Sequence, residues 1–251
     1  MIYITGDTHG EFGRFSMKNF KEQKEMTRDD YVIICGDFGG VWETGIESDH
    51  EKYWLDWFEE HSYTLLFVDG NHENFDRLNE YPVKEWNGGK VHELRPHVLH
   101  LMRGQVFTID GKKIFTFGGA SSHDIQGGIL DKADPNFLKK RKNLDREWIP
   151  YRIKNISWWE EELANEEEME EGRINLQKHN NTVDFIITHC AASSTQVLIG
   201  GSLYKPDRVT DYLEEIKNNT NFKKWFFGHY HDNRNIYDKE VLLYEQIIRI
   251  S

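Results

Sequence analysis

Five short polar motifs hold side chains of the types that bind metal ions. They are GDTHG at 6–10, GDFGG at 36–40, GNHE at 70–73, THC at 188–190 and GHYH at 228–231, and each follows a short apolar run. Carboxylates, imidazoles and amide oxygens suit divalent ions such as Mn, Fe or Zn. The candidate residues that the motifs supply are Asp7, His9, Asp37, Asn71, His72, His189, His229 and His231.

The position of each motif after an apolar run predicts that these side chains meet. Neighbouring parallel strands bring their carboxyl ends to one edge of a sheet, where α/β proteins place their sites. The glycines before the ligands allow the backbone to approach closely. Asp7 and His9 are two residues apart, as are His229 and His231. In extended chain, this spacing points both side chains of a pair to the same side.

Short apolar runs and helix-like segments alternate along the chain, which predicts an α/β fold. Two late strand pairs favour mixed rather than purely parallel sheets. The expected strands are 2–5, 31–35, 64–68, 113–117, 185–188, 224–227 and 241–250. The expected helices are 12–25, 49–61, 160–171 and 207–218.

The chain has 251 residues and a formal net charge of −12, and we expect a single domain over 1–251. The acidic balance argues against extended nucleic-acid binding and against an anionic membrane partner. No apolar run approaches the roughly 18 residues that span a bilayer. The two cysteines, Cys35 and Cys190, close apolar runs and are expected to be buried. Without a signal-like segment or a disulfide framework, a cytoplasmic location is expected.

A charged, lid-like insertion is predicted around 119–180. Residues 132–154 carry eight basic and three acidic side chains, and residues 160–171 contain eight glutamates. Both runs are typical of solvated surface. The sharper hypothesis is that residues 119–155 form a lid or substrate loop, in which Arg141, Arg146 or Arg152 meets an anionic substrate.

Taken together, GDTHG, GD, GNHE, TH and GHYH resemble the ordered motif set of the calcineurin-like metallophosphoesterase superfamily. The resemblance extends from residue 6 to residue 231. It implies a four-layer αββα sandwich of two mixed β-sheets flanked by helices. It also implies a centre of two divalent metal ions, most readily Mn, with Fe, Zn, Ni or Mg as alternatives.

The resemblance assigns a role to each motif residue. Asp7, His9, Asp37 and His231 would hold the first ion, and Asp37 would bridge to a second ion completed by Asn71, His189 and His229. His72 would be the catalytic histidine, which is not a ligand and stabilises or protonates the leaving oxygen. Asp37 and Asp69 are alternative carboxylates for holding His72 in place.

One departure concerns the second motif, where protein phosphatases of the superfamily read G-D-x-x-D-R. This chain has GDFGGVW and lacks the arginine that grips phosphate. Arg14 and Arg77 follow the first and third motifs and are candidate substitutes, and His123 is a further candidate substrate contact.

The resulting prediction is a phosphoesterase that hydrolyses phosphomonoesters or phosphodiesters by attack of a metal-bridging hydroxide. Small or nucleotide-type substrates are favoured, and a short oligonucleotide is compatible with the basic stretch. One alternative is a Ser/Thr protein phosphatase. The other is a catalytically silent, metal-stabilised binding module, against which the complete ligand set counts.

Overall fold

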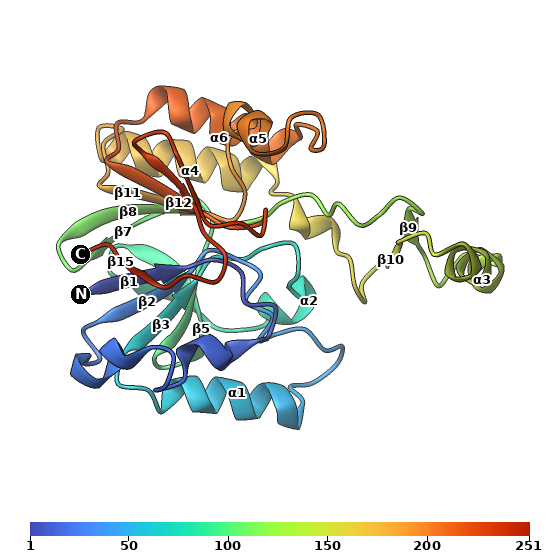
Figure 1. The fold of residues 1–251 in the computed structure, drawn as a ribbon, viewed down its shortest axis with the longest axis horizontal. Helices are drawn as coiled ribbons and strands as arrows, with labels where there is room; N and C mark the ends of the chain where they lie inside the picture. Colours follow the sequence, from blue (N-terminus) through green and yellow to red (C-terminus); the bar gives the residue numbers. More distant parts are fainter.

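A computed structural model describes residues 1–251 as two large mixed sheets with helices on their outer faces (Figure 1). The first sheet has seven strands in the order β15-β1-β2-β3-β6-β5-β4. Their bounds are β1 (Ile2–Thr5), β2 (Tyr31–Ile34), β3 (Thr64–Phe67), β4 (Val83–Trp86), β5 (Gly89–Arg95), β6 (Val98–Leu101) and β15 (Ile248–Arg249).

The second sheet has six strands in the order β13-β14-β12-β11-β8-β7. Their bounds are β7 (Gln105–Ile109), β8 (Lys112–Phe117), β11 (Phe185–Thr188), β12 (Lys224–Phe227), β13 (Arg234–Ile236) and β14 (Glu240–Leu242).

The central strands of each sheet run parallel, and the edges are antiparallel. β1, β2, β3 and β6 are parallel in the first sheet, as are β8, β11, β12 and β14 in the second. The carboxyl ends of the parallel strands in each sheet therefore share one edge, as expected from the sequence.

Both faces of the central strands are buried, which explains their continuous apolar runs. In β2, Ile33 packs between the two sheets, whereas Val32 and Ile34 face the outer layer. In β12, Phe226 lies between the sheets and Trp225 faces outward. This alternation produces three apolar clusters, one between the sheets and one under each outer layer.

The helices complete the four layers that the resemblance implies. α1 (Asp49–Glu59) packs outside the seven-stranded sheet. α4 (Glu166–Lys178) and α6 (Arg208–Asn219), with the shorter α5 (Ser193–Gly200), lie outside the six-stranded sheet (Figure 1). α1, α4 and α6 begin with capping boxes, which satisfy backbone N–H groups of the first turn. The α/β fold with two mixed sheets is thus confirmed.

A two-stranded arm extends from the sandwich in the region of the predicted insertion, and it comprises residues 125–154. It contains β9 (Ile129–Leu130), α3 (Phe137–Glu147) and β10 (Arg152–Ile153), with β9 and β10 paired in parallel. Figure 1 shows the arm standing away from the sandwich, on the side where β1 ends.

Three predicted elements differ from the structure. Residues 12–25 form two 3-10 helices, η1 (Phe12–Phe15) and η2 (Lys21–Glu25), because the Gln23 side chain binds the carbonyls of Phe15 and Phe20. The predicted strand 241–250 is divided between the sheets as β14 and β15. The predicted helix 160–171 is a 3-10 turn, η3 (Glu160–Glu162), followed by α4, which is capped by Asn165.

Several elements were not predicted, namely β4 to β7, β9, β10, β13, the short α2 (Phe75–Leu78), α3 and α5. Cys35 and Cys190 are both buried and unpaired, as expected. No helix has the length and apolar character needed to cross a membrane.

Candidate metal centre

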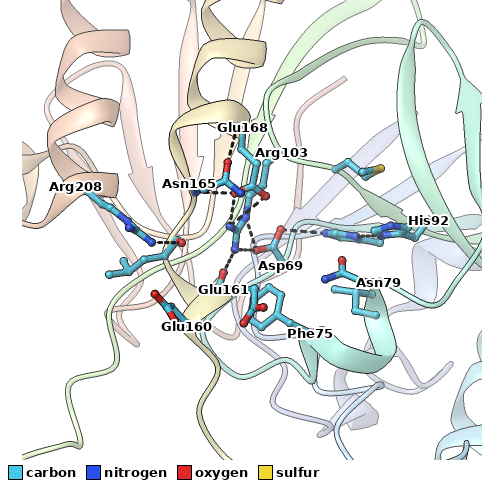
Figure 2. Close-up of a pocket in the computed structure, with 14 residues that line it drawn as sticks. Asp69, Phe75, Asn79, His92, Arg103, Glu160, Glu161, Asn165, Glu168 and Arg208 are labelled. Atoms are coloured by element: carbon cyan, nitrogen blue, oxygen red, sulfur yellow. Dashed lines mark hydrogen bonds and ion pairs between the residues drawn. The ribbon is translucent and has the colours of Figure 1, made fainter. Parts of the chain in front are cut away.

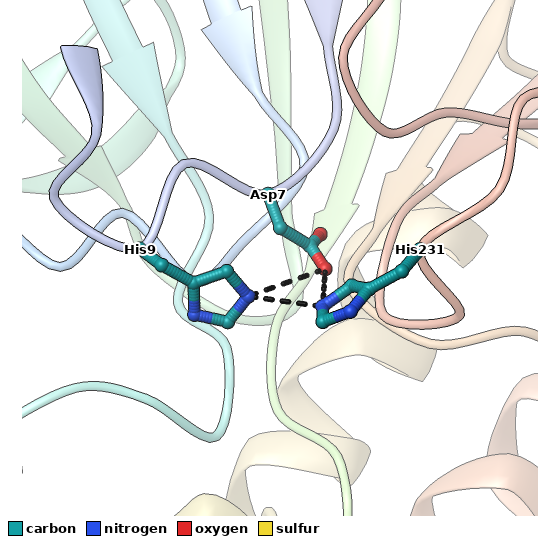
Figure 3. A group of neighbouring side chains, drawn as sticks. All are labelled: Asp7, His9 and His231. Atoms are coloured by element: carbon teal, nitrogen blue, oxygen red, sulfur yellow. Dashed lines mark hydrogen bonds and ion pairs between the residues drawn. The ribbon is translucent and has the colours of Figure 1, made fainter.

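The first group of candidate ligands lies where β1 and β12 end, and Figure 3 shows its three side chains converging. Nε2 of His231 lies 3.2 Å from Oδ2 of Asp7, and Nε2 of His9 lies 3.9 Å from the same oxygen. The two Nε2 atoms are 3.0 Å apart. Asp7 is buried and His231 is half exposed, so the group opens to solvent on one side.

Asp37, after β2, connects this group to a second one. Its Oδ2 lies 3.6 Å from Nε2 of His9, and its Oδ1 lies 3.4 Å from Nε2 of His189. Burial by itself would raise the pKa of Asp37, but the surrounding histidines hold that pKa below its usual value. The side chain is therefore a buried carboxylate whose two oxygens face different sets of ligands.

The second group contains His189, Asn71 and His229. Nε2 of His189 is 3.2 Å from Oδ1 of Asn71, and its Nδ1 is 2.9 Å from the carbonyl oxygen of Cys35. The carbonyl accepts a hydrogen bond from Nδ1, which leaves the Nε2 lone pair available for a cation. Burial lowers the pKa of His229 well below its usual value, so this ring is neutral.

Left-handed backbone positions several of these residues, and here the extended-chain expectation was wrong. His9, Asp37, His229 and His231 have φ angles of 47°, 46°, 70° and 49°. Non-glycine residues rarely adopt this conformation, and strained backbone of this kind is concentrated at functional sites. The ligands converge because the chain turns sharply after each strand, not because a strand continues through the motif.

Two motif glycines confirm the expectation of close backbone approach. A Cβ atom on Gly70 would lie 2.0 Å from Oδ1 of Asp37, and one on Gly228 would lie 2.0 Å from Oδ1 of Asp7. Neither position can carry a side chain unless a candidate metal ligand moves. The glycines therefore serve to bring the backbone against the buried carboxylates.

His72 lies beside both ligand groups and makes a contact that the sequence did not predict. Its backbone N–H donates to Oδ1 of Asp37 at 2.8 Å. Nη2 of Arg152 donates to Nε2 of the His72 ring at 2.7 Å. Burial lowers the pKa of His72 to about 4; the charge of Asp37 opposes this shift and that of Arg152 adds to it.

A cleft of about 310 Å³ opens over this centre, and Asp37, Asn71, His72 and three residues of the GHYH motif line it. His123, Asp124, Arg152 and Tyr204 complete the lining. Nε2 of His123 is 2.8 Å from Nε2 of His229. Arg152 is buried at the base of the arm and is held by Asp124, with Nε 2.7 Å from Oδ1.

The other three candidate substrate residues lie outside this cleft. Arg14 donates to the carbonyls of Tyr244 and Asp7 and so ties the C-terminal segment to the first motif. Arg77 is buried and forms an ion pair with Glu51. Arg141 is exposed on α3. The protein contacts of Arg14 and Arg77 account for the positions of both side chains without a substrate.

Asp69 does not hold His72, contrary to one of the two alternatives. Figure 2 shows Asp69 paired with Arg103. Nη2 of Arg103 is 2.6 Å from Oδ2 of Asp69, and Nε2 of His100 is 3.1 Å from its Oδ1. Nδ1 of His100 in turn lies 2.9 Å from Nδ1 of His92. This buried network adjoins a separate pocket of about 370 Å³ and supports the strand end that precedes GNHE.

Three further residues near the centre were not identified from the sequence. Ser122 accepts a hydrogen bond from Nδ2 of Asn71 at 3.3 Å, and its position just after a predicted strand was an available signal. Glu73 accepts from the backbone N–H of Phe38 at 2.7 Å and so joins the GNHE and GDFGG motifs. Tyr204 lies after α5 in irregular chain, where no sequence pattern marks it.

Comparison with known proteins identifies this arrangement. Residues 1–233 match the family model of the calcineurin-like phosphoesterases. The chain is also similar to lariat debranching enzyme A of Xenopus laevis, with 26% identity over 144 residues. That match covers 52% of this chain and 26% of the debranching enzyme, so only about a quarter of the relative's length is compared.

Proposed function

Because the chain belongs to the calcineurin-like phosphoesterase family, we propose that it is a metal-dependent phosphoesterase with two divalent ions at its centre. The observation that carries this proposal is the position of Asp37. Its two oxygens face His9 on one side and His189 on the other, at 3.6 and 3.4 Å. A carboxylate that binds two ions must face both groups of ligands, and Asp37 does so.

The residues present fit such ions. The first ion would bind Asp7, His9, His231 and Oδ2 of Asp37, and the second would bind Oδ1 of Asp37, Asn71, His189 and His229. The Nε2 atoms of His9 and His231 face each other 3.0 Å apart. Two nitrogen atoms at this distance can share one hydrogen or bind one cation. The mixture of oxygen and imidazole ligands suits Mn²⁺, with Fe, Zn, Ni or Mg as alternatives.

When bound, two such ions supply an activated water as nucleophile and neutralise charge on the phosphoryl group. The chain's own residues do the positioning. The guanidinium of Arg152 lines the cleft, and its N–H groups that are not bound to Asp124, Ser157 or His72 can donate hydrogen bonds to phosphate oxygens. His123 also lines the cleft and is available as a further contact. Both are proposed to bind the phosphoryl group.

His72 is proposed to stabilise or protonate the leaving oxygen. Arginine can only donate hydrogen bonds, so Nε2 of His72 is the acceptor in the pair. A phosphate group that draws the guanidinium away from His72 would free Nε2 to face the leaving oxygen. Burial lowers the pKa of the His72 ring, so the ring alone is neutral. The negative charge of a bound substrate would favour the protonated ring.

The substrate class is proposed as a phosphomonoester or phosphodiester of small or nucleotide type. The name of the similar Xenopus laevis protein, a lariat debranching enzyme, makes a nucleic-acid diester a specific candidate. The missing arginine of the second motif counts against the protein-phosphatase alternative. Arg152 brings a guanidinium to the cleft from another element, which removes part of that objection. A cytoplasmic location stays a prediction.

The test is hydrolysis of a p-nitrophenyl phosphate monoester and of the bis-p-nitrophenyl diester by metal-stripped protein reloaded with Mn²⁺. Wild type and Asp37→Ala are compared, and bound metal is measured in both. Turnover that the substitution abolishes supports the proposal, and the ratio of the two activities gives the substrate class. Absence of turnover on both esters by metal-loaded wild type would favour the silent binding module.

A further inference from the structure

The arm is anchored beside the candidate centre at both of its ends. After β10, Nε1 of Trp159 donates to Asp76 at 2.8 Å, and the indole is buried. Before β9, Ser122 binds Glu162 through both its backbone N–H and its hydroxyl. Arg152 of β10 reaches His72 itself. The base of the arm is therefore part of the cleft, whereas α3 stands away from the sandwich (Figure 1).

Charge is strongly segregated between the arm and the rest of the molecule. Residues 132–154 carry eight basic and three acidic side chains, whereas the remaining 228 residues carry 23 basic and 40 acidic ones. A polyanion is repelled by the acidic surface of the sandwich and attracted by this one cationic projection.

Apart from the buried Arg152, the cations of the arm are exposed and available. Lys132, Lys139 and Lys142 have no ion pair. Lys140, Arg141 and Arg146 pair only with Asp134, Asp145 and the adjacent Glu147 inside the arm, and their own side chains are 57%, 51% and 72% exposed. Ion pairs that are this exposed are weak and yield readily to a phosphate.

A large aromatic side chain accompanies these cations. Trp148, which ends α3, is 92% exposed, and its backbone is left-handed with φ 55°. Both features are unfavourable for a tryptophan that has no partner. Cationic side chains together with an exposed aromatic ring are the combination with which proteins bind single-stranded nucleic acid.

We propose that the arm binds the flanking phosphates and a base of a single-stranded oligonucleotide whose reacting phosphate lies in the cleft beside Arg152. This inference rests on the proposed phosphoesterase function and deepens it by naming the substrate class. The continuity from Arg152 to α3 favours a substrate strand over a second copy of the acidic protein. The net charge of −12 argues against extended, non-specific binding, whereas a localised arm needs only a short strand.

The test uses Mn²⁺-loaded protein and a fluorescent twelve-nucleotide deoxythymidine oligomer with phosphorothioate linkages, which slow hydrolysis. Binding is followed by fluorescence anisotropy at several salt concentrations. The arm variant is Lys132→Glu, Lys139→Glu and Lys142→Glu combined, and Trp148→Ala is made separately. The matched control reverses three exposed lysines of the opposite region, Lys18→Glu, Lys21→Glu and Lys24→Glu.

We expect the arm variant to weaken oligomer binding at least tenfold more than the control variant does. The slope of log Kd against log salt should fall by about 2, since each neutralised phosphate of a single strand contributes about 0.7. Trp148→Ala should weaken binding about fivefold or more, because about fivefold is the lower end of the range expected when one base loses its stacking partner. Hydrolysis of bis-p-nitrophenyl phosphate should stay within twofold of wild type in all variants, and that result also shows that they are folded.

Two outcomes overturn the inference. One is equal binding by the arm and control variants. The other is a wild-type dimer in light scattering that the arm variant converts to monomers, which would assign the arm to a second copy. Failure of the phosphoesterase proposal is distinguishable, because it abolishes hydrolysis of the small ester in wild type whatever the arm does.

Discussion

Nη2 of Arg152 lies 2.7 Å from Nε2 of His72, although 80 residues separate them in the chain. The arm is what joins them, since β10 returns the chain to the cleft with Arg152 buried. A guanidinium thus stands next to the candidate catalytic histidine, in a family member whose second motif lacks an arginine.

Replacing Arg152 with alanine should lower kcat/KM for a p-nitrophenyl ester about 10- to 100-fold. A hydrogen bond from a charged group contributes about 1.5–3 kcal/mol, and each 1.4 kcal/mol is a factor of ten. The bound Mn²⁺ content should not change, because Arg152 is not a candidate ligand. Arg141→Ala is the control, since this exposed arginine pairs only within the arm. Equal losses in both variants would contradict a specific role for Arg152.

The roles of His72 and Asp37 should separate in metal content. His72→Asn is expected to keep two ions per chain while kcat falls about 10²- to 10⁴-fold, the usual contribution of a general acid. Asp37→Ala should lose both activity and bound metal, because both ligand groups share this carboxylate. Mass-spectrometric metal analysis with parallel kinetics checks both expectations. Two ions retained by Asp37→Ala would mean that Asp37 is not the bridge.

Gly228→Ala should weaken Mn²⁺ binding about 10- to 100-fold, as loss of a group that supports a metal ligand does. The new Cβ would lie 2.0 Å from Oδ1 of Asp7 and must displace that carboxylate. Gly13→Ala is the matched control, because nothing lies within 4 Å of its Cβ position. Calorimetric titration with Mn²⁺ measures both variants. Unchanged affinity in Gly228→Ala would show that Asp7 is not a ligand.

Arg77→Leu should reduce the free energy of unfolding by about 3–5 kcal/mol, because it leaves the buried Glu51 carboxylate without its partner. KM should not change, since the structure gives Arg77 no contact with the cleft. Lys52→Ala, which breaks only an exposed pair with Asp56, should change stability by less than about 1 kcal/mol. Urea unfolding measures stability, and a raised KM in Arg77→Leu would restore this residue as a substrate contact.

His92 should make the protein less stable in acid. Burial and the neighbouring His100 lower the pKa of His92 to about 4 from an ordinary 6.5. Between these values the unfolded chain binds more protons, so stability falls as the pH drops from 6.5 toward 4. His92→Gln removes this titrating group and should shrink the loss of stability between about pH 7 and pH 4.5 by about 1–3 kcal/mol, at about 1.4 kcal/mol per pKa unit. Identical losses in urea unfolding would contradict this assignment.

The convergence of the motif residues could be predicted from the sequence because each motif comes directly after a strand of a parallel sheet. Strand direction brings Asp7 and Asp37 to neighbouring positions, because they follow adjacent parallel strands of one sheet. His189 follows β11 of the other sheet, and the packing of the two sheets brings it to the same group. The burial of the central strands was predictable from their composition, since continuous apolar runs such as YVIIC are typical of strands covered on both faces. The edge strand β4 and its neighbour β5 were missed because neither has that apolar signature: β4 is mostly exposed, and β5 alternates apolar with charged residues.

The sequence by itself determined which residue types lie at the carboxyl ends of the strands, since local apolar patterns specify the strands and each motif follows one of them. Only the tertiary structure decided which arginine reaches the cleft. Arg14 and Arg77 are near the motifs in sequence, yet Tyr244 and Glu51 bind them, whereas Arg152 arrives through the arm. It also decided that His9 and His231 converge through left-handed turns. The physical reason is that contacts between segments far apart in the chain determine where long side chains and turns lie. Such contacts cannot be predicted from local sequence patterns.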